Sequence, residues 1–103
     1  MKVLVIGKGS IGMEHIENLR TLGYGVVTVD SDPLKKADYL DYMVALSKEK
    51  IGACLVCTPT VLHIRIAEYV IDKGVDCFVE KPLSHDMDGV LELVDLAKDK
   101  GVI

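Results

Sequence analysis

Short apolar runs and longer amphipathic stretches alternate along this chain. The short runs, rich in β-branched residues, predict buried strands at residues 3–6, 26–29, 51–57 and 75–79. Apolar residues at helical spacing predict helices at residues 10–22, 61–73 and 86–100. Continuously apolar strands are typical of a parallel sheet that is covered on both faces. The pattern therefore predicts an α/β fold, a doubly wound parallel sheet that forms a single domain over residues 1–103.

The segment between the second and third of these strands is unusually short. Only 20 residues separate Asp30 from Ile51, which is too few for two helical crossovers and a strand between them. One interpretation is a short strand at residues 37–40, reached by a loop and followed by a helix over residues 41–50. The other is one helix from Pro33 to Glu49 without a further strand. Either arrangement leaves a face near this edge uncovered and predicts exposed apolar side chains and self-association into a homo-oligomer such as a dimer.

Composition and charge narrow the class of protein. Half of the 103 residues are hydrophobic and 27% are charged, which excludes intrinsic disorder. A net charge of −4 argues against a nucleic-acid partner or an anionic membrane. No apolar run is long enough to span a membrane, and the N-terminus lacks the layout of a secretion signal. We therefore expect a soluble, cytoplasmic protein.

Three cysteines raise the question of redox or metal chemistry. Cys54 and Cys57 form a C-x-x-C pattern within a predicted strand. Their Cα atoms then lie roughly 10 Å apart with side chains on opposite faces, too far for a disulfide bond. The sequence offers no second pair of ligands for zinc. We expect all three cysteines, Cys77 included, to be core residues, and we expect no metal site.

A glycine motif follows the first predicted strand. Residues 7–12 read G-K-G-S-I-G and open a helix, which is the context that gives this motif meaning. Gly7 permits a tight turn, Gly9 lets the backbone approach a pyrophosphate, and Gly12 lets the helix pack closely on the strand. The N–H groups at the start of the helix then face the phosphates. The cofactor-binding residues predicted at this end of the sheet are Gly7, Gly9, Ser10, Ile11, Gly12, Asp30 and Ser31.

Asp30 bears on the choice between NAD and NADP. It ends the second strand, 18 residues after Gly12, where a carboxylate can accept hydrogen bonds from both ribose hydroxyls. A carboxylate also repels a 2′-phosphate, so the sequence favours NAD over NADP. Lys35 and Lys36 follow closely and could offset that charge, although a solvated helix start is the simpler explanation of these two lysines.

Two further motifs follow the later strands. Residues 58–63 fit T-P-x-x-x-H, and residues 80–82 read E-K-P. Together with the glycine motif, Asp30 and their spacings, they make residues 1–103 resemble the N-terminal half of the glucose-fructose oxidoreductase / inositol dehydrogenase family, often called Gfo/Idh/MocA. Members of that family are NAD(P)-dependent oxidoreductases that act on a hydroxyl or carbonyl group, typically of sugars and inositols. The resemblance also favours the short strand at residues 37–40 over the single long helix.

The resemblance implies roles for the first of these motifs. Thr58, Pro59 and Thr60 would line the nicotinamide-ribose side of a cleft, and His63 would lie close to the cofactor. From the residues alone, His63 could equally be a half-buried packing residue, because it falls on helical spacing.

The second motif would carry the chemistry. Glu80 would hold the nicotinamide ribose, Lys81 would be the catalytic residue that polarises the reacting oxygen, and Pro82 would bend the chain so that Lys81 points into the cleft. A lysine in such a place can stabilise charge on an alkoxide during hydride transfer. An ordinary surface ion pair is the alternative explanation of Glu80 and Lys81. His15 is expected on a helix surface and His85 in solvent.

One departure from the family pattern matters for activity. The family's enzymes carry a second domain that supplies substrate contacts, and this sequence does not contain one. A cofactor-binding domain alone cannot enclose a substrate or exclude water. We therefore expect a truncated chain, which ends as residues 102–103 begin another strand and is incomplete for catalysis on its own. The alternative is a stand-alone regulatory module that senses NAD(H) or another nucleotide, although such modules lack the T-P-x-x-x-H and E-K-P motifs.

Overall fold

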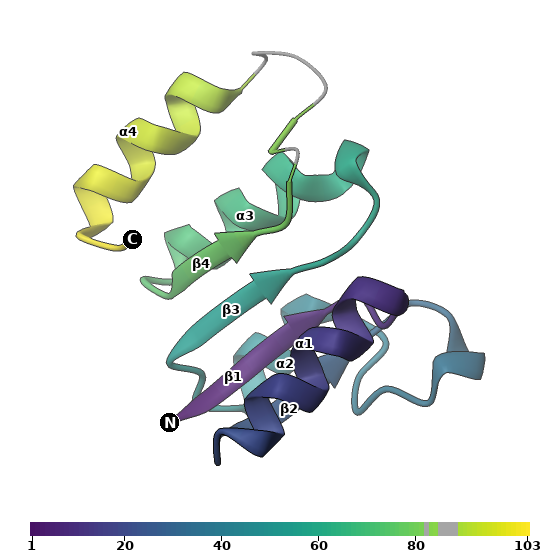
Figure 1. Cartoon of the computed structure of the whole chain (residues 1–103). Helices are drawn as coiled ribbons and strands as arrows, with labels where there is room; N and C mark the ends of the chain where they lie inside the picture. Colours follow the sequence, from purple (N-terminus) through teal and green to yellow (C-terminus); the bar gives the residue numbers. More distant parts are fainter. Residues whose placement is uncertain (82, 85–88) are drawn as a thin grey trace.

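The computed structural model describes residues 1–81, 83–84 and 89–103. A parallel four-stranded sheet lies at its centre, in the order β2-β1-β3-β4 (Figure 1). The strands are β1 (Lys2–Ile6), β2 (Gly25–Val29), β3 (Ala53–Val56) and β4 (Asp76–Val79). The helices are α1 (Ser10–Thr21), α2 (Tyr42–Lys48), α3 (His63–Asp72) and α4 (Val90–Lys100), with 3₁₀ turns η1 (Pro33–Lys35) and η2 (Thr60–Leu62). The predicted α/β class and parallel sheet are confirmed, and the predicted start of the last helix falls outside the described residues.

Helices cover the sheet from both faces, as predicted. Leu4, Val27 and Val56 point to one face and form the main core with Ala45 of α2 and Val70 of α3. Successive side chains of a strand alternate between faces. Val5 therefore points to the opposite face. On that face α1 packs on β1 and β2 (Figure 1). This packing buries Ile16 almost completely.

The last helix packs on its neighbour and lies farther from the strands. Leu93 of α4 meets Ala67 and Ile71 of α3 in a second, smaller core. Beyond α4, the N–H of Cys77 in β4 donates to the carbonyl of Ile103. The expected start of a strand at residues 102–103 thus lies beside β4, although it is not a regular strand.

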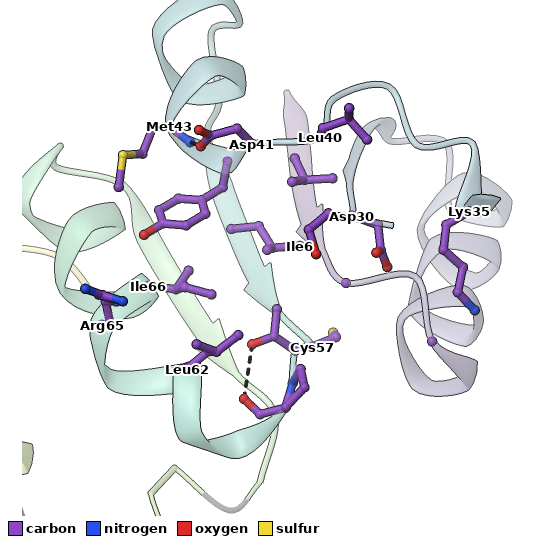
Figure 2. Close-up of a pocket in the computed structure, with 17 residues that line it drawn as sticks. Ile6, Asp30, Lys35, Leu40, Asp41, Met43, Cys57, Leu62, Arg65 and Ile66 are labelled. Carbon is purple, nitrogen blue, oxygen red and sulfur yellow. Dashed lines mark hydrogen bonds between the residues drawn. The ribbon is translucent and has the colours of Figure 1, made fainter. Parts of the chain in front are cut away.

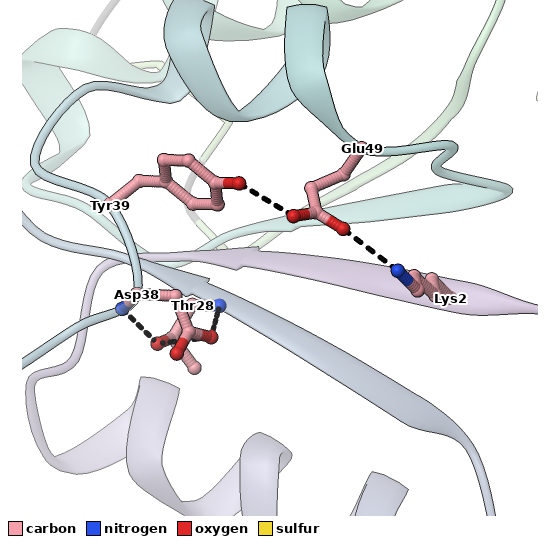
Figure 3. Close-up of polar contacts among 5 residues, drawn as sticks. All are labelled: Lys2, Thr28, Asp38, Tyr39 and Glu49. Carbon is pink, nitrogen blue, oxygen red and sulfur yellow. Dashed lines mark hydrogen bonds and ion pairs between the residues drawn. The ribbon is translucent and has the colours of Figure 1, made fainter.

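The predicted strand at residues 37–40 is reduced to a single bridge between Val29 and Tyr39. The N–H of Tyr39 donates to the Thr28 carbonyl, and the Asp30 N–H donates to the Tyr39 carbonyl. A longer parallel ladder would next pair the Thr28 N–H with a backbone carbonyl. The Asp38 carboxylate accepts that N–H instead, at 2.9 Å (Figure 3). The side chain therefore competes with the backbone and ends the strand.

The alternative of one helix from Pro33 to Glu49 is wrong. Lys36 adopts a left-handed conformation (φ 53°) that ends η1. The α2 helix starts separately, where the Asp41 side chain accepts a hydrogen bond from the Met43 N–H at 2.8 Å. Such N-caps satisfy backbone donors that a helix start otherwise leaves unpaired.

Exposed apolar side chains occur near this edge of the sheet, as the sequence predicts. They are Leu34, Leu40, Met43 and Val44. Within the described part of the chain, no helix has the length and apolar character that crossing a membrane requires.

Candidate functional site

A cleft of about 700 Å³ opens at the carboxyl ends of the strands. Its walls come from the loops after β1, β2 and β3 and from the starts of α2 and α3. Figure 2 shows Asp30 and Lys35 on one side of this cleft and Leu62 and Arg65 on the other. Ligands of open parallel sheets bind at this edge, beside the point where the strand order reverses. In this sheet that point lies between β1 and β3.

The glycine loop combines a tight turn with close packing. Gly7 has a φ of +102°, and a Cβ there would lie 2.7 Å from the carbonyl oxygen of Cys57. At Gly12 an added Cβ would overlap the Gly7 carbonyl oxygen. Gly9 differs, because a Cβ at Gly9 would have no atom within 4 Å. Two glycines of the motif are thus required by the fold, and the third leaves space beside the cleft. Ser10 and Ile11 begin α1 at this point.

Asp30 is held in a fixed orientation at the edge of the cleft. One carboxylate oxygen accepts the Lys8 N–H at 2.8 Å, and the other accepts the Asp32 N–H at 2.9 Å. A carboxylate oxygen can accept more than one hydrogen bond, so both oxygens retain acceptor capacity toward a ligand. Ser31 and Lys35 line the cleft beside Asp30, whereas Lys36 is outside its lining.

Some residues of the T-P-x-x-x-H motif line the cleft, and others support the loop that forms its wall. Thr58 and Pro59 line the cleft, and Thr60 begins η2 outside the lining. His63 is 1% exposed, and its Nε2 donates to the Thr58 carbonyl at 2.8 Å. His63 is therefore a buried residue that holds the loop, which agrees with packing more than with direct contact to a ligand.

Glu80 and Lys81 of the E-K-P motif follow β4, at the other end of this sheet edge, and lie outside the cleft lining. Glu80 directly follows β4, and its Oε2 lies 3.0 Å from Nε2 of His15 in α1. The hydrogen bond from His15, helped by the backbone N–H of Lys81, lowers the pKa of Glu80. Lys81 is exposed, and Pro82 lies outside the described residues, as does His85.

His15 is not the plain surface residue that the sequence suggests. Its ring also meets Phe78 edge-on, with the ring centroids 6.1 Å apart. Glu80 is thus paired with a histidine, and no ion pair joins Glu80 to Lys81 in the structure described here. Strand alternation places Phe78 and Glu80 on the α1 side of the sheet, which is the one sequence signal that could have suggested this pair.

Sequence reasoning also missed the far wall of the cleft. Four side chains there come from the start of α2 and from η2 and α3: Tyr42, Met43, Leu62 and Arg65. None of them is a fixed position of a motif, and only the fold brings them to the glycine loop.

The cysteines show neither disulfides nor a cluster for metal. All three are free, and no group of metal-ligating side chains occurs among the residues described. Cys54 is fully buried, as expected, and pairs in register with Cys77 of β4. The expectation is wrong in degree for the other two, because Cys57 and Cys77 are partly exposed. Cys57 lines the cleft, where burial raises the pKa of its thiol to about 11, so this thiol is uncharged at neutral pH.

A strand, a glycine turn, a helix start and an acidic residue after the next strand together define a dinucleotide-binding Rossmann domain. The comparison with known families identifies which one. The model described as "Oxidoreductase family, NAD-binding Rossmann fold", of the Gfo/Idh/MocA group, matches residues 1–103. The chain belongs to this family.

Individual relatives agree with this assignment. The inositol 2-dehydrogenase of Pseudarthrobacter chlorophenolicus is 32% identical over 92% of the chain and 32% of its own length. GenD2 from gentamicin A biosynthesis, solved in complex with NAD, matches with a TM-score of 0.88 at 30% identity. The match covers all of this chain and 33% of the GenD2 chain. The WlbA dehydrogenase of Bordetella pertussis shares the fold, with a TM-score of 0.90 at 22% identity over 98% of this chain and 35% of its own. The chain thus spans about a third of the length of these relatives.

Proposed function

We propose that this domain binds NAD across the carboxyl edge of its sheet, as the cofactor-binding part of an oxidoreductase. The adenosine half lies in the cleft beside Asp30 and Ser31, and the pyrophosphate lies on the loop formed by residues 7–12. The nicotinamide half points toward Thr58, Thr60, Glu80 and Lys81. The observation that carries the proposal is the Asp30 carboxylate, which two backbone N–H groups orient at the rim of a cleft that also contains the glycine loop.

Binding would use groups that the fold already presents. The N–H groups at the start of α1 carry the positive end of the helix dipole, which favours phosphate. Both oxygens of Asp30 can still accept hydrogen bonds from the adenosine ribose. The apolar side chains of Leu40, Met43 and Leu62 at the rim suit the face of an adenine ring.

NAD is the expected cofactor, and NADP is the weaker ligand. The negative charge of Asp30 disfavours a 2′-phosphate at the ribose position. Lys35 also lines the cleft and offsets part of that charge, so we expect a preference and not complete exclusion. The complex of GenD2 with NAD, at 30% identity, supports this choice.

We propose that the whole enzyme transfers hydride between this cofactor and a hydroxyl or carbonyl group of a sugar-like metabolite. NAD supplies the hydride chemistry itself. Lys81 is the proposed catalytic residue: its ammonium would stabilise negative charge on the reacting oxygen and hold the proton there. An inositol 2-dehydrogenase among the relatives is consistent with such a substrate.

Titration calorimetry with NADH and NADPH tests the binding proposal. We expect NADH to bind the 103-residue chain more tightly than NADPH. Loss of a charge-assisted hydrogen-bond acceptor in Asp30→Ala should weaken NADH binding about 10- to 100-fold. Asp95→Asn removes an exposed carboxylate of α4, outside the cleft lining, and is the charge control. No binding of either nucleotide by the unmodified chain, or equal effects of the two substitutions, would contradict the proposal.

We also propose that the protein is cytoplasmic and that it self-associates. Part of the exposed apolar surface, Leu40 and Met43, lines the cleft. The cofactor therefore competes with a second copy as the group that covers these side chains. Sedimentation velocity with and without NADH distinguishes the two, because a dimer built on this surface should dissociate when NADH binds.

A further inference from the structure

One side-chain pair connects the cofactor-binding helix to the far edge of the sheet. His15 lies in α1, which packs on β1 and β2, whereas Glu80 follows β4 at the other end of the strand order. The hydrogen bond of 3.0 Å between them therefore reaches across the end of β3. The edge-on contact between the rings of His15 and Phe78 accompanies it.

The position of this pair differs from that of a core contact. The side chains of His15 and Glu80 are 31% and 25% exposed, and Phe78 beside them is 55% exposed. Little packing therefore holds the α1 side of β4 at this place. The orientation of the Glu80 carboxylate therefore depends on its hydrogen bond with His15.

The same arrangement bears on the direction of Lys81. Glu80 directly precedes Lys81, so a Glu80 carboxylate that is held by the His15 ring N–H fixes the chain at the point where Lys81 leaves the strand. The first turn of α1 also provides the proposed phosphate site, one turn before His15. A single helix would thus set the position of both the phosphates and the proposed catalytic end.

We propose that His15 is a positioning residue, which holds the Glu80 carboxylate and through it the Lys81 backbone at the nicotinamide end of the site. This inference rests on the proposed binding of NAD. It predicts a specific pattern: loss of His15 should affect the nicotinamide half of the ligand and leave the adenosine half unchanged. A purely structural role would affect both halves equally, because α1 carries the phosphate site.

The experiment compares NADH with ADP, which lacks both the nicotinamide and its ribose. We expect His15→Ala to weaken NADH binding about five- to tenfold, the effect of losing one charge-assisted hydrogen bond. ADP binding should stay within about twofold of the unmodified chain. His15→Gln should restore most of the NADH affinity, because its side-chain amide can donate to Glu80 in place of the ring N–H. Glu17→Ala, an exposed substitution on the same helix, is the control and should change neither affinity.

A double-mutant cycle with Glu80→Ala completes the test. If His15 acts through Glu80, the double variant should bind NADH no more weakly than Glu80→Ala alone. Equal weakening of NADH and ADP in His15→Ala, no weakening of NADH, or additive effects in the cycle would each overturn the positioning role. Failure of the unmodified chain to bind either ligand would overturn the proposed NAD site itself, a result distinct from these three.

Discussion

The two ends of the proposed cofactor site are built from different kinds of contact. Asp30 is oriented by two backbone N–H groups, those of Lys8 and Asp32. Glu80 is oriented by a side chain, that of His15. A loop backbone is fixed when the fold forms, whereas a half-exposed side chain can change rotamer at small cost. The proposed adenosine end is therefore preorganised, and the proposed nicotinamide end is adjustable.

The two edge strands of the sheet, β2 and β4, also differ in how firmly neighbouring groups hold them. Beside β2, the bridge at Tyr39 extends the sheet, and Glu49 joins Tyr39 to Lys2 of β1 (Figure 3). Beside β4, Phe78 stays more than half exposed on the α1 side. This difference indicates that groups of this domain alone could bind the adenosine half of the cofactor. Lys81, in contrast, lies in an exposed environment.

The largest effect is expected from a change that disrupts both ends at once. Gly12→Ala places a methyl group where the Gly7 carbonyl oxygen lies, so α1 must move away from β1. Overpacking against backbone should destabilise the fold by about 3 kcal/mol. Urea unfolding measures this loss of stability. Calorimetry should show that NADH and ADP both lose affinity.

Gly9→Ala is the matched control within the same loop. Its Cβ meets no atom within 4 Å, so stability should change by less than about 0.5 kcal/mol. The methyl group nevertheless intrudes where we place the pyrophosphate, and nucleotide affinity should fall. Equal stability of the two variants would contradict the packing role of Gly12, and unchanged affinity in Gly9→Ala would contradict the proposed phosphate site.

A smaller effect, confined to the adenosine end, is expected from Thr28→Val. The Thr28 hydroxyl accepts the Asp38 N–H at 2.9 Å and donates to the Asp38 carboxylate at 3.2 Å. Valine has the same shape but leaves the Asp38 N–H without this partner, at a cost of about 1–2 kcal/mol in the free energy of unfolding. Because the Tyr39 bridge adjoins Asp30, NADH and ADP should lose affinity by the same factor.

Thr21→Val, at the exposed end of α1, is the control for this substitution. It should leave both stability and affinity nearly unchanged. If Thr28→Val weakened NADH while ADP kept its affinity, the two ends would not be independent, and the comparison between them would fail.

The preorganised end is also the end that the sequence predicts well. Its signals are local: a buried strand, glycines that a turn requires, and an acidic residue where the next strand stops. The close packing of Gly12 and the position of Asp30 follow from these signals. The continuously apolar strands likewise predict the two covered faces of the sheet.

The remaining features depend on contacts between distant segments, which local patterns do not encode. The third strand fails because the Asp38 side chain captures the N–H of Thr28, ten residues earlier in the chain. His15 meets Glu80 across 65 residues. For His63 the sequence is equally consistent with packing and with binding, and the burial of its side chain becomes visible only when the loop after β3 is in place.

The smallest effect is expected at Glu49, which joins Tyr39 to Lys2 near the proposed adenosine end, and it depends on pH. Hydrogen bonds from Lys2 and then Tyr39 lower the pKa of Glu49 from its ordinary 4.5, and the bond to Glu49 raises the pKa of Tyr39 above 10.0. A lowered carboxyl pKa adds stability that is present above the ordinary value and lost as the pH falls through the folded value. A raised tyrosine pKa adds stability that is present below pH 10 and lost as the pH rises.

Glu49→Gln should therefore lower Tm near neutral pH and reduce the fall of Tm at acidic and at alkaline pH. Part of the fall at acidic pH should remain, because Glu80 also has a lowered pKa. Thermal unfolding from pH 3 to 11 measures this, with the exposed Glu68→Gln as control, and profiles of identical shape would show that Glu49 does not stabilise this edge.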